Sequence, residues 1–194
     1  NMNKTHPPVY YADYLQLSHL LSCQKPKSAE YGTPAHDEML FIIVHQTYEL
    51  WFKQILYELD SVIEMFHKDY VDEKNIGITV ARLERVVEIQ KILLGQIKVL
   101  ETMTPLDFLD FRDFLTPASG FQSFQFRLLE NKLGMKPEQR VLYNQKTYHT
   151  LFSEAHQQLM VQSENEPNLF QVVEKWLVRT PFLDFEGFHF WSYF

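Results

Sequence analysis

Two polar side chains lie in apolar or aromatic stretches where they could contact a small molecule. His45 follows four apolar residues and shares a helix face with Phe41, because residues four apart are neighbours on a helix. One interpretation is a core histidine that bonds to a neighbouring helix. The other is a polar group in an apolar ligand pocket, with Phe41 as its wall. The residues alone leave both interpretations open.

Arg112 is the second candidate, since it directly follows an aromatic residue and lies one helical turn after Phe108. Its stem could cover apolar surface, or its guanidinium could pair with Asp110 or Asp113. Alternatively, its planar fork could bind a small-molecule carboxylate through two parallel hydrogen bonds. The Ser-Gly pair at 119–120 would then add a hydroxyl and a close backbone approach.

Several kinds of site are absent from the sequence. No HExxH, CxxC, GxGxxG, phosphate-binding loop or GxSxG motif occurs. The pairs His36/His45 and His149/His156 are nine and seven residues apart, which does not suit two metal ligands on one helix face. We therefore expect neither a zinc site nor a di-iron carboxylate site.

Composition narrows the class of protein further. The net charge of −7 gives no basic field for nucleic acid or an anionic membrane. The single cysteine, Cys23, suits a reducing compartment. The longest apolar run, residues 39–44, is too short to span a bilayer, and the polar first residues do not resemble a signal peptide. These features predict a soluble, cytoplasmic protein with no membrane or nucleic-acid partner.

Helical periodicity dominates the elements that must position these residues. A helix is expected from about residue 35 to 68, because apolar side chains recur every three or four residues: Val44, Tyr48, Trp51, Ile55, Leu59, Val62 and Phe66. A second long helix should follow Asp72 and end near Thr102, with Leu83, Val86, Leu93, Ile97 and Leu100 on its stripe. We predict an all-α helical bundle with long central helices, in a single domain over residues 1–194.

Shorter helices should follow. Thr104 can cap a helix that has Pro105 at its first position and Asp107 completing a capping box. Its apolar face would hold Phe108, Phe111 and Leu115, and residues 116–120 should break it. The next helix should carry Phe121, Phe124, Leu128 and Leu129 and end at Gly134, and further helices should include residues 167–179.

Several blocks of sequence, in order along most of the chain, resemble the tryptophan 2,3-dioxygenase family. They are HDEMLFIIVHQ at 36–46, ELWFK at 49–53, LETMTP at 100–105, FR at 111–112 and PASGFQS at 117–123. YADYL at 11–15, and EKWL with RTP at 174–181, are similar to further segments of the family. The match extends from about residue 10 to residue 191.

The resemblance implies an α-helical, homotetrameric enzyme (a dimer of dimers) with b-type haem iron. Such an enzyme converts L-tryptophan and O₂ to N-formylkynurenine, the first step of the kynurenine pathway. His45 corresponds to the histidine that hydrogen-bonds the indole N–H, Phe41 to the aromatic wall over the haem, and Arg112 to the clamp on the substrate carboxylate. Phe108 and Leu115 correspond to residues of the substrate pocket, and Ser119 and Gly120 to residues on the haem side. Residues 1–16 correspond to an inter-subunit segment, in which Tyr11 and Tyr14 complete a neighbouring subunit's pocket.

One part of the family pattern has no counterpart in the sequence. The histidine that ligates the haem iron and a threonine that contacts the substrate ammonium would lie beyond Phe194, so we expect no metal ligand in this chain. Residues 187–194 are mostly aromatic and carry no formal charge, which predicts that they pack against additional residues beyond Phe194. The alternative is a non-catalytic tryptophan- or haem-binding module or an inactive fragment, and an absorption spectrum with a reducible haem band would separate the two.

Overall fold

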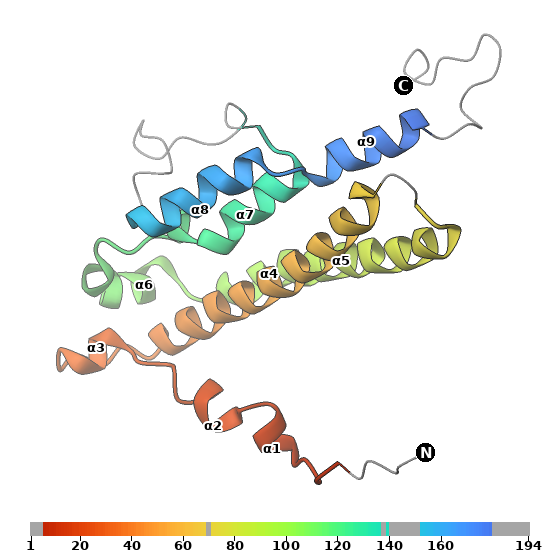
Figure 1. The fold of residues 1–194 in the computed structure, drawn as a ribbon. Coiled ribbons are helices and arrows are strands. Elements are labelled where there is room, and N and C mark those ends of the chain that lie inside the picture. Colours follow the sequence, from red (N-terminus) through yellow and green to blue (C-terminus); the bar gives the residue numbers. More distant parts are fainter. Residues whose placement is uncertain (1–5, 69–70, 137–138, 140–151, 180–194) are drawn as a thin grey trace. The chain divides into compact units, whose positions relative to one another are not determined.

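The computed structural model describes residues 6–68, 71–136, 139 and 152–179 (Figure 1). Every regular element among these residues is helical, which confirms the predicted all-α class. Clustering of neighbouring residues divides the chain into two compact units. The first unit comprises Asn1–His45 with Val99–Thr116, and the second comprises Gln46–Lys98 with Pro117–Phe194. The prediction of a single domain over the whole chain stays a prediction.

The first unit contains the beginning of the long helix α4 (Glu38–His67) and the helix that carries Arg112. The helix that carries Arg112 is α6 (Pro105–Arg112), and the other elements of this unit are α1 (Tyr11–Tyr14), α2 (Leu17–Leu20), α3 (Lys27–Glu30), the end of α5 (Glu73–Leu100) and the 3₁₀ helix η1 (Asp113–Leu115). The α4 bounds agree closely with the helix expected from about residue 35 to 68. Leu115, expected on the face of α6, instead lies in η1.

The start of α6 confirms the predicted capping box. The hydroxyl oxygen of Thr104 accepts a hydrogen bond from the Asp107 backbone N–H (3.3 Å), and Thr104 N–H donates to the Asp107 carboxylate (2.8 Å). Pro105 occupies the first turn, where its missing N–H costs nothing. The Thr104 hydroxyl and, to a smaller extent, the Thr104 backbone N–H lower the pKa of Asp107, because both donate hydrogen bonds to the charged carboxylate.

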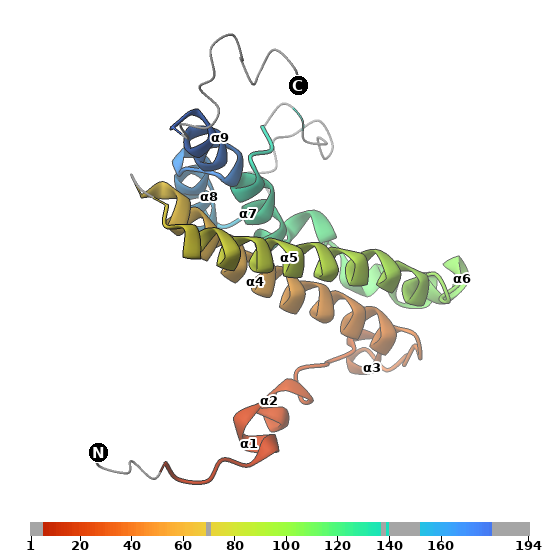
Figure 2. The same ribbon diagram turned by 90° about the vertical axis from the view of Figure 1, so that its right-hand side faces the viewer.

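The second unit is organised around α4 and α5, which run side by side in both views (Figures 1 and 2). It also holds η2 (Gly120–Gln122), α7 (Phe124–Leu133), α8 (Glu154–Asn165) and α9 (Leu169–Arg179). A buried core joins α4, α5 and α7 through Phe52, Ile55, Leu56, Leu59, Val86, Ile89 and Leu129. Apolar contacts of this kind, rather than intrinsic propensity, stabilise most helices in proteins.

The apolar stripes predicted for the long helices are largely confirmed. Val44, Ile55, Leu59, Val62 and Phe66 are buried, and Tyr48 and Trp51 are half-buried. Ile97, expected on the α5 stripe, is 43% exposed.

Two expectations about α7 have opposite outcomes. Phe121, which was expected in α7, lies in η2 instead. Helix α7 begins only at Phe124, because Ser123 caps it by accepting a hydrogen bond from Phe126 N–H. Gly134 ends α7 as predicted, in a left-handed conformation (φ 89°) that L-residues rarely adopt.

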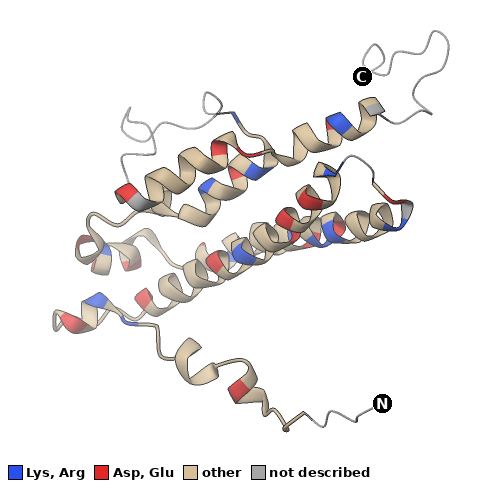
Figure 3. Ribbon diagram, in the orientation of Figure 1, with Lys and Arg blue, Asp and Glu red and all other residues tan. Residues whose placement is uncertain are grey.

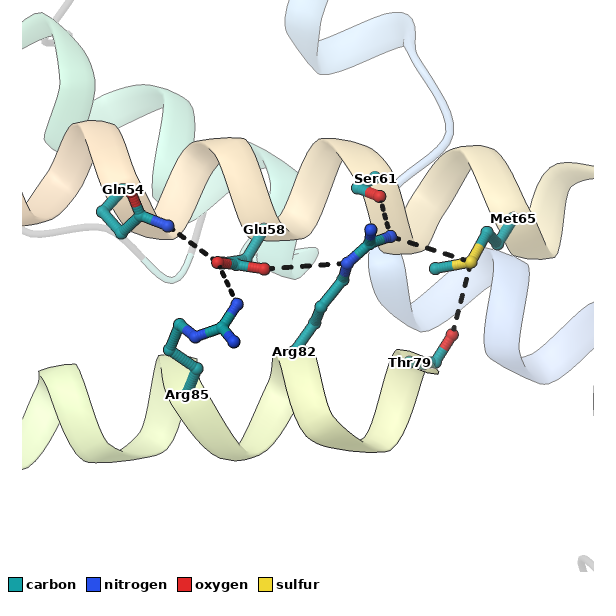
Figure 4. Close-up of polar contacts among 7 residues, drawn as sticks. All are labelled: Gln54, Glu58, Ser61, Met65, Thr79, Arg82 and Arg85. Carbon is teal, nitrogen blue, oxygen red and sulfur yellow. Dashed lines mark hydrogen bonds and ion pairs between the residues drawn. The ribbon is translucent and has the colours of Figure 1, made fainter. Parts of the chain in front are cut away.

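A polar network inside the second unit connects α4 to α5 (Figure 4). The Glu58 carboxylate is buried and accepts hydrogen bonds from Gln54 (2.7 Å) and from the guanidinium of Arg85 (2.6 Å). The guanidinium of Arg82 lies 3.8 Å from its other oxygen and also donates to Ser61. Arg82 and Arg85 on α5 thus both approach one buried carboxylate on α4, which connects the two helices at this point.

Candidate functional site

The candidate site is built on an aromatic cluster, defined as Phe41 on α4 with Phe108 and Phe111 on α6, all within the first unit. The Phe41 ring centroid lies 5.6 Å from that of Phe108 and 5.5 Å from that of Phe111. Phe108 and Phe111 meet edge to face at 5.4 Å. Phe111 is fully buried, so it anchors α6 to α4, while Phe41 and Phe108 remain half-buried.

His45 is attached to this cluster through Phe41 in two ways. The imidazole ring lies on the Phe41 ring with centroids 4.1 Å apart, and Nδ1 is 2.7 Å from the Phe41 carbonyl oxygen. Because a carbonyl oxygen can only accept, we infer that Nδ1 carries the proton of the neutral ring. Nε2 is then a hydrogen-bond acceptor, suited to an N–H donor on a ligand.

The partner of His45 differs from the one expected for a core histidine. Its bond goes to a carbonyl of its own helix, and the side chain is half-buried. The interpretation as a core side chain bonded to a neighbouring helix is therefore not what the described residues show.

Arg112 lies at the other end of the same series of contacts. Its guanidinium carbon is 5.8 Å from the centroid of the Phe108 ring, and its side chain is exposed. Among residues 6–68, 71–136, 139 and 152–179 it forms no ion pair, so the alternative pairing with Asp110 or Asp113 is not observed. Its planar donors are thus available to a carboxylate.

These groups together suit an amphipathic aromatic ligand. Contacts run from the Arg112 guanidinium through Phe108 and Phe41 to the His45 imidazole. A cation, flat apolar walls and a neutral acceptor match a molecule that carries a carboxylate, an aromatic ring and a ring N–H.

The other predicted site residues are more scattered. Leu115 is half-buried in η1, whereas Tyr11 and Tyr14 on α1 are 75% and 76% exposed. Ser119 caps η2 by accepting a hydrogen bond from Phe121 N–H (3.3 Å). Beyond its chain neighbours, no described atom lies within 4 Å of the position of a Cβ on Gly120, and the close approach of its backbone to a ligand stays a prediction.

Metal-binding residues do not cluster in the part of the chain that the structure describes, where no group of three or more His, Cys, Asp or Glu could hold an ion. His156 stacks on Phe124 with ring centroids 4.6 Å apart. His149, His189 and the aromatic residues 187–194 lie outside the described residues. No described helix has the length and apolar character needed to cross a membrane.

Sequence reasoning missed one buried residue beside the site. The sequence places Glu38 only near the start of a predicted helix, but its side chain is 1% exposed and bonds to α3. An acidic residue in a first turn is normally solvated, so the sequence carried no signal for this contact.

Comparison with known proteins gives consistent matches along the chain. The family model described as tryptophan 2,3-dioxygenase matches residues 2–194. A tryptophan 2,3-dioxygenase of Bdellovibrio bacteriovorus is 62% identical over 96% of this chain and 52% of its own length. Those of Dictyostelium discoideum and Mus musculus are 53% and 55% identical over 95% and 96% of this chain, and 46% of their own lengths. The chain thus spans about half the length of the curated relatives it matches.

Proposed function

Because the chain belongs to the tryptophan 2,3-dioxygenase family, we propose that it forms the substrate-binding part of a haem-dependent enzyme that opens the indole ring of L-tryptophan with O₂. The product would be N-formylkynurenine, which begins the kynurenine pathway of tryptophan degradation. We also propose that the complete protein works in the cytoplasm as a homotetramer, a dimer of dimers.

The observation that carries this proposal is the arrangement of Arg112 and His45 around the aromatic cluster. Tryptophan has a carboxylate for the guanidinium, an indole ring for the phenylalanine walls and an indole N–H for Nε2 of His45. The 2.7 Å bond to the Phe41 carbonyl occupies Nδ1 as a donor and leaves Nε2 as the ring nitrogen that faces a ligand.

The aromatic cluster also fits a haem, because flat apolar rings pack well against a planar macrocycle. Phe41 would form the aromatic wall of the haem site, and the haem-side roles of Ser119 and Gly120 rest on the family resemblance alone. We assign no iron ligand among the described residues. A bound haem would supply the iron that activates O₂.

The chain's own residues would act by position and environment. Arg112 would fix the amino-acid end of tryptophan and His45 the indole, so that the reacting ring carbons are held in place, which is a proximity effect. The cluster would exclude water from the ring. We propose that His45 orients the indole through a hydrogen bond and does not act as an obligatory base.

The test is Arg112→Lys, assayed with tryptophan and with tryptamine, which lacks the carboxylate. An ammonium cannot reproduce two coplanar hydrogen bonds, and charge-assisted bonds contribute roughly 1.5–3 kcal/mol where the bound substrate covers them from water. We expect kcat/KM for tryptophan to fall about ten- to hundredfold. Tryptamine should be a poor substrate for the wild type and barely worse for the variant.

Arg85→Lys is the matched control, because Arg85 is an exposed arginine of the second unit that binds a protein carboxylate, Glu58. It should affect both substrates equally. If Arg112→Lys also lowers activity equally for tryptophan and tryptamine, and lowers the melting temperature, Arg112 supports the helix and does not clamp the substrate.

The N-terminal segment tests the proposed assembly. Helices α1 and α2 have no buried residue, and Figure 3 shows them almost without charged side chains. Exposed Tyr11 and Tyr14 would complete the pocket of a neighbouring subunit. Deleting residues 1–16 should raise the KM for tryptophan and loosen the oligomer, as measured by kinetics and sedimentation. Tyr57→Ser, at a tyrosine 73% exposed on α4, is the control and should change neither. Unchanged sedimentation and kinetics after the deletion would reject this role.

A further inference from the structure

Glu38, in the first turn of α4, connects that helix to a segment that precedes it in the chain. Its side chain is 1% exposed, and the two carboxylate oxygens accept hydrogen bonds from the backbone N–H groups of Lys27 (2.7 Å) and Ser28 (2.9 Å). A buried carboxylate requires such donors, and each bond to a charged acceptor is stronger than a neutral one. The first turn of α4 therefore holds the first turn of α3.

Helix α3 depends on this anchor because it is only four residues long. A helix of that length does not form alone, since its nucleation cost exceeds what so few hydrogen bonds return. At its other end Gly32 adopts a left-handed conformation (φ 80°), and Thr33 N–H donates to the Ser28 carbonyl (2.9 Å). The Ser28 hydroxyl accepts from Ala35 N–H (2.9 Å), which closes the connection back to α4.

Helix α3 also packs against the helix that carries Arg112. Helix α3 contacts both α6 and η1. The Tyr31 ring, directly after α3, stacks on Phe114 in η1 with ring centroids 5.3 Å apart and planes 23° from parallel. Phe114 follows Arg112 by two residues, so the stack bears directly on the end of α6.

We propose that Glu38 is a positioning residue, which acts through α3 and Tyr31 to set where α6 presents Arg112 relative to Phe41 and His45. The inference rests on the proposed function, because it assigns Arg112 to substrate binding. The contacts of Phe41 with Phe108 and Phe111 join α4 directly to α6 through one side chain. Glu38 adds a separate attachment through α3, and two attachment points restrain a rotation of α6 about Phe41 that one would permit.

The first test is Glu38→Gln in the protein expressed from its complete gene. The amide keeps one acceptor but turns an NH₂ group toward a backbone N–H, so one bond is lost and two donors face each other. We expect the KM for tryptophan to rise roughly five- to thirtyfold, with kcat nearly unchanged and tryptamine kinetics unaffected. Glu64→Gln, at an exposed glutamate of the same helix, should leave all of these values unchanged.

The second measurement does not depend on activity. Amide hydrogen exchange of residues 105–115 should be roughly tenfold faster in Glu38→Gln than in the wild type. Tyr31→Ala should have a similar effect and is not expected to unfold the protein, because Tyr31 is 62% exposed. Tyr57→Ala is its matched control. The double variant Glu38→Gln/Tyr31→Ala should be no worse than the more severe single variant, since both act on one path.

The outcomes separate this inference from the proposed function. Wild-type exchange at residues 105–115 in both Glu38→Gln and Tyr31→Ala would overturn it, as would additive effects in the double variant. Equal losses for tryptophan and tryptamine would show a general structural role and also overturn it. A wild-type protein that does not oxidise tryptophan would reject the proposed function, and the exchange data would still decide whether Glu38 holds α6.

Discussion

Replacing His45 with alanine separates an orienting role from a role as a base. The imidazole contributes one neutral hydrogen bond to the Phe41 carbonyl and one ring contact at 4.1 Å. These interactions contribute about 0.5–1.5 kcal/mol each, so the fold should lose no more than about 3 kcal/mol. In the substrate complex, an indole N–H left without its acceptor costs about 1–3 kcal/mol. We expect kcat/KM for tryptophan to fall by about one to two decades.

Steady-state kinetics and a melting curve on the same preparation measure both losses. His45→Gln is the informative companion, because a carboxamide oxygen can accept the indole hydrogen bond but cannot take up a proton. It should retain more activity than His45→Ala, and 1-methyltryptophan, which has no indole N–H, should not distinguish the two. If both variants lose all activity while the fold and haem binding persist, His45 is an obligatory base and the orienting role is wrong.

Two further predictions concern stability. Glu58→Gln should lower the free energy of unfolding, measured by chemical denaturation, by about 1–2 kcal/mol. The effect is this small because Arg82 and Arg85 are 33% and 55% exposed, so solvent screens their charges. An unchanged denaturation midpoint would mean that this network does not stabilise the helix pair. Hydrogen bonds from Thr104 lower the pKa of Asp107. The ionised Asp107 carboxylate therefore stabilises the fold fully above the usual aspartate pKa, and this stabilisation is lost as the pH falls through the lowered pKa of the folded protein. Asp107→Asn should therefore flatten the acid side of the melting-temperature profile, and a parallel profile would contradict this cause.

The long elements could be predicted because their residues repeat one local rule many times. The stripe of α4 and the capping box at Thr104 each depend on neighbours within a turn or two, so the chain encodes them redundantly. Gly134 is similar, because its left-handed conformation is a property of a single residue. The boundary between η1 and α6, at Asp113, differed from expectation since local spacing barely distinguishes 3₁₀ from α-helical turns.

The site was less predictable, because its contacts join residues that are far apart in the chain. The residue pattern selected His45 and Arg112 and the resemblance implied their roles, but the choice between a structural and a binding side chain needed their partners. Only the structure shows that Arg112 has no carboxylate partner in the described part and that the His45 bond remains within its own helix. The buried state of Glu38 was invisible, since its donors are backbone groups that every sequence possesses.

The partner of His45 Nδ1 is a peptide carbonyl, and this has a consequence for how the pocket can evolve. No substitution at position 41 removes a backbone oxygen, so the protonation pattern of the ring is inherited with the helix itself. The ring of Phe41, by contrast, can be exchanged for a larger or smaller side chain in a single mutational step. The size of the aromatic wall at position 41 and the hydrogen-bonding direction of His45 can therefore diverge independently.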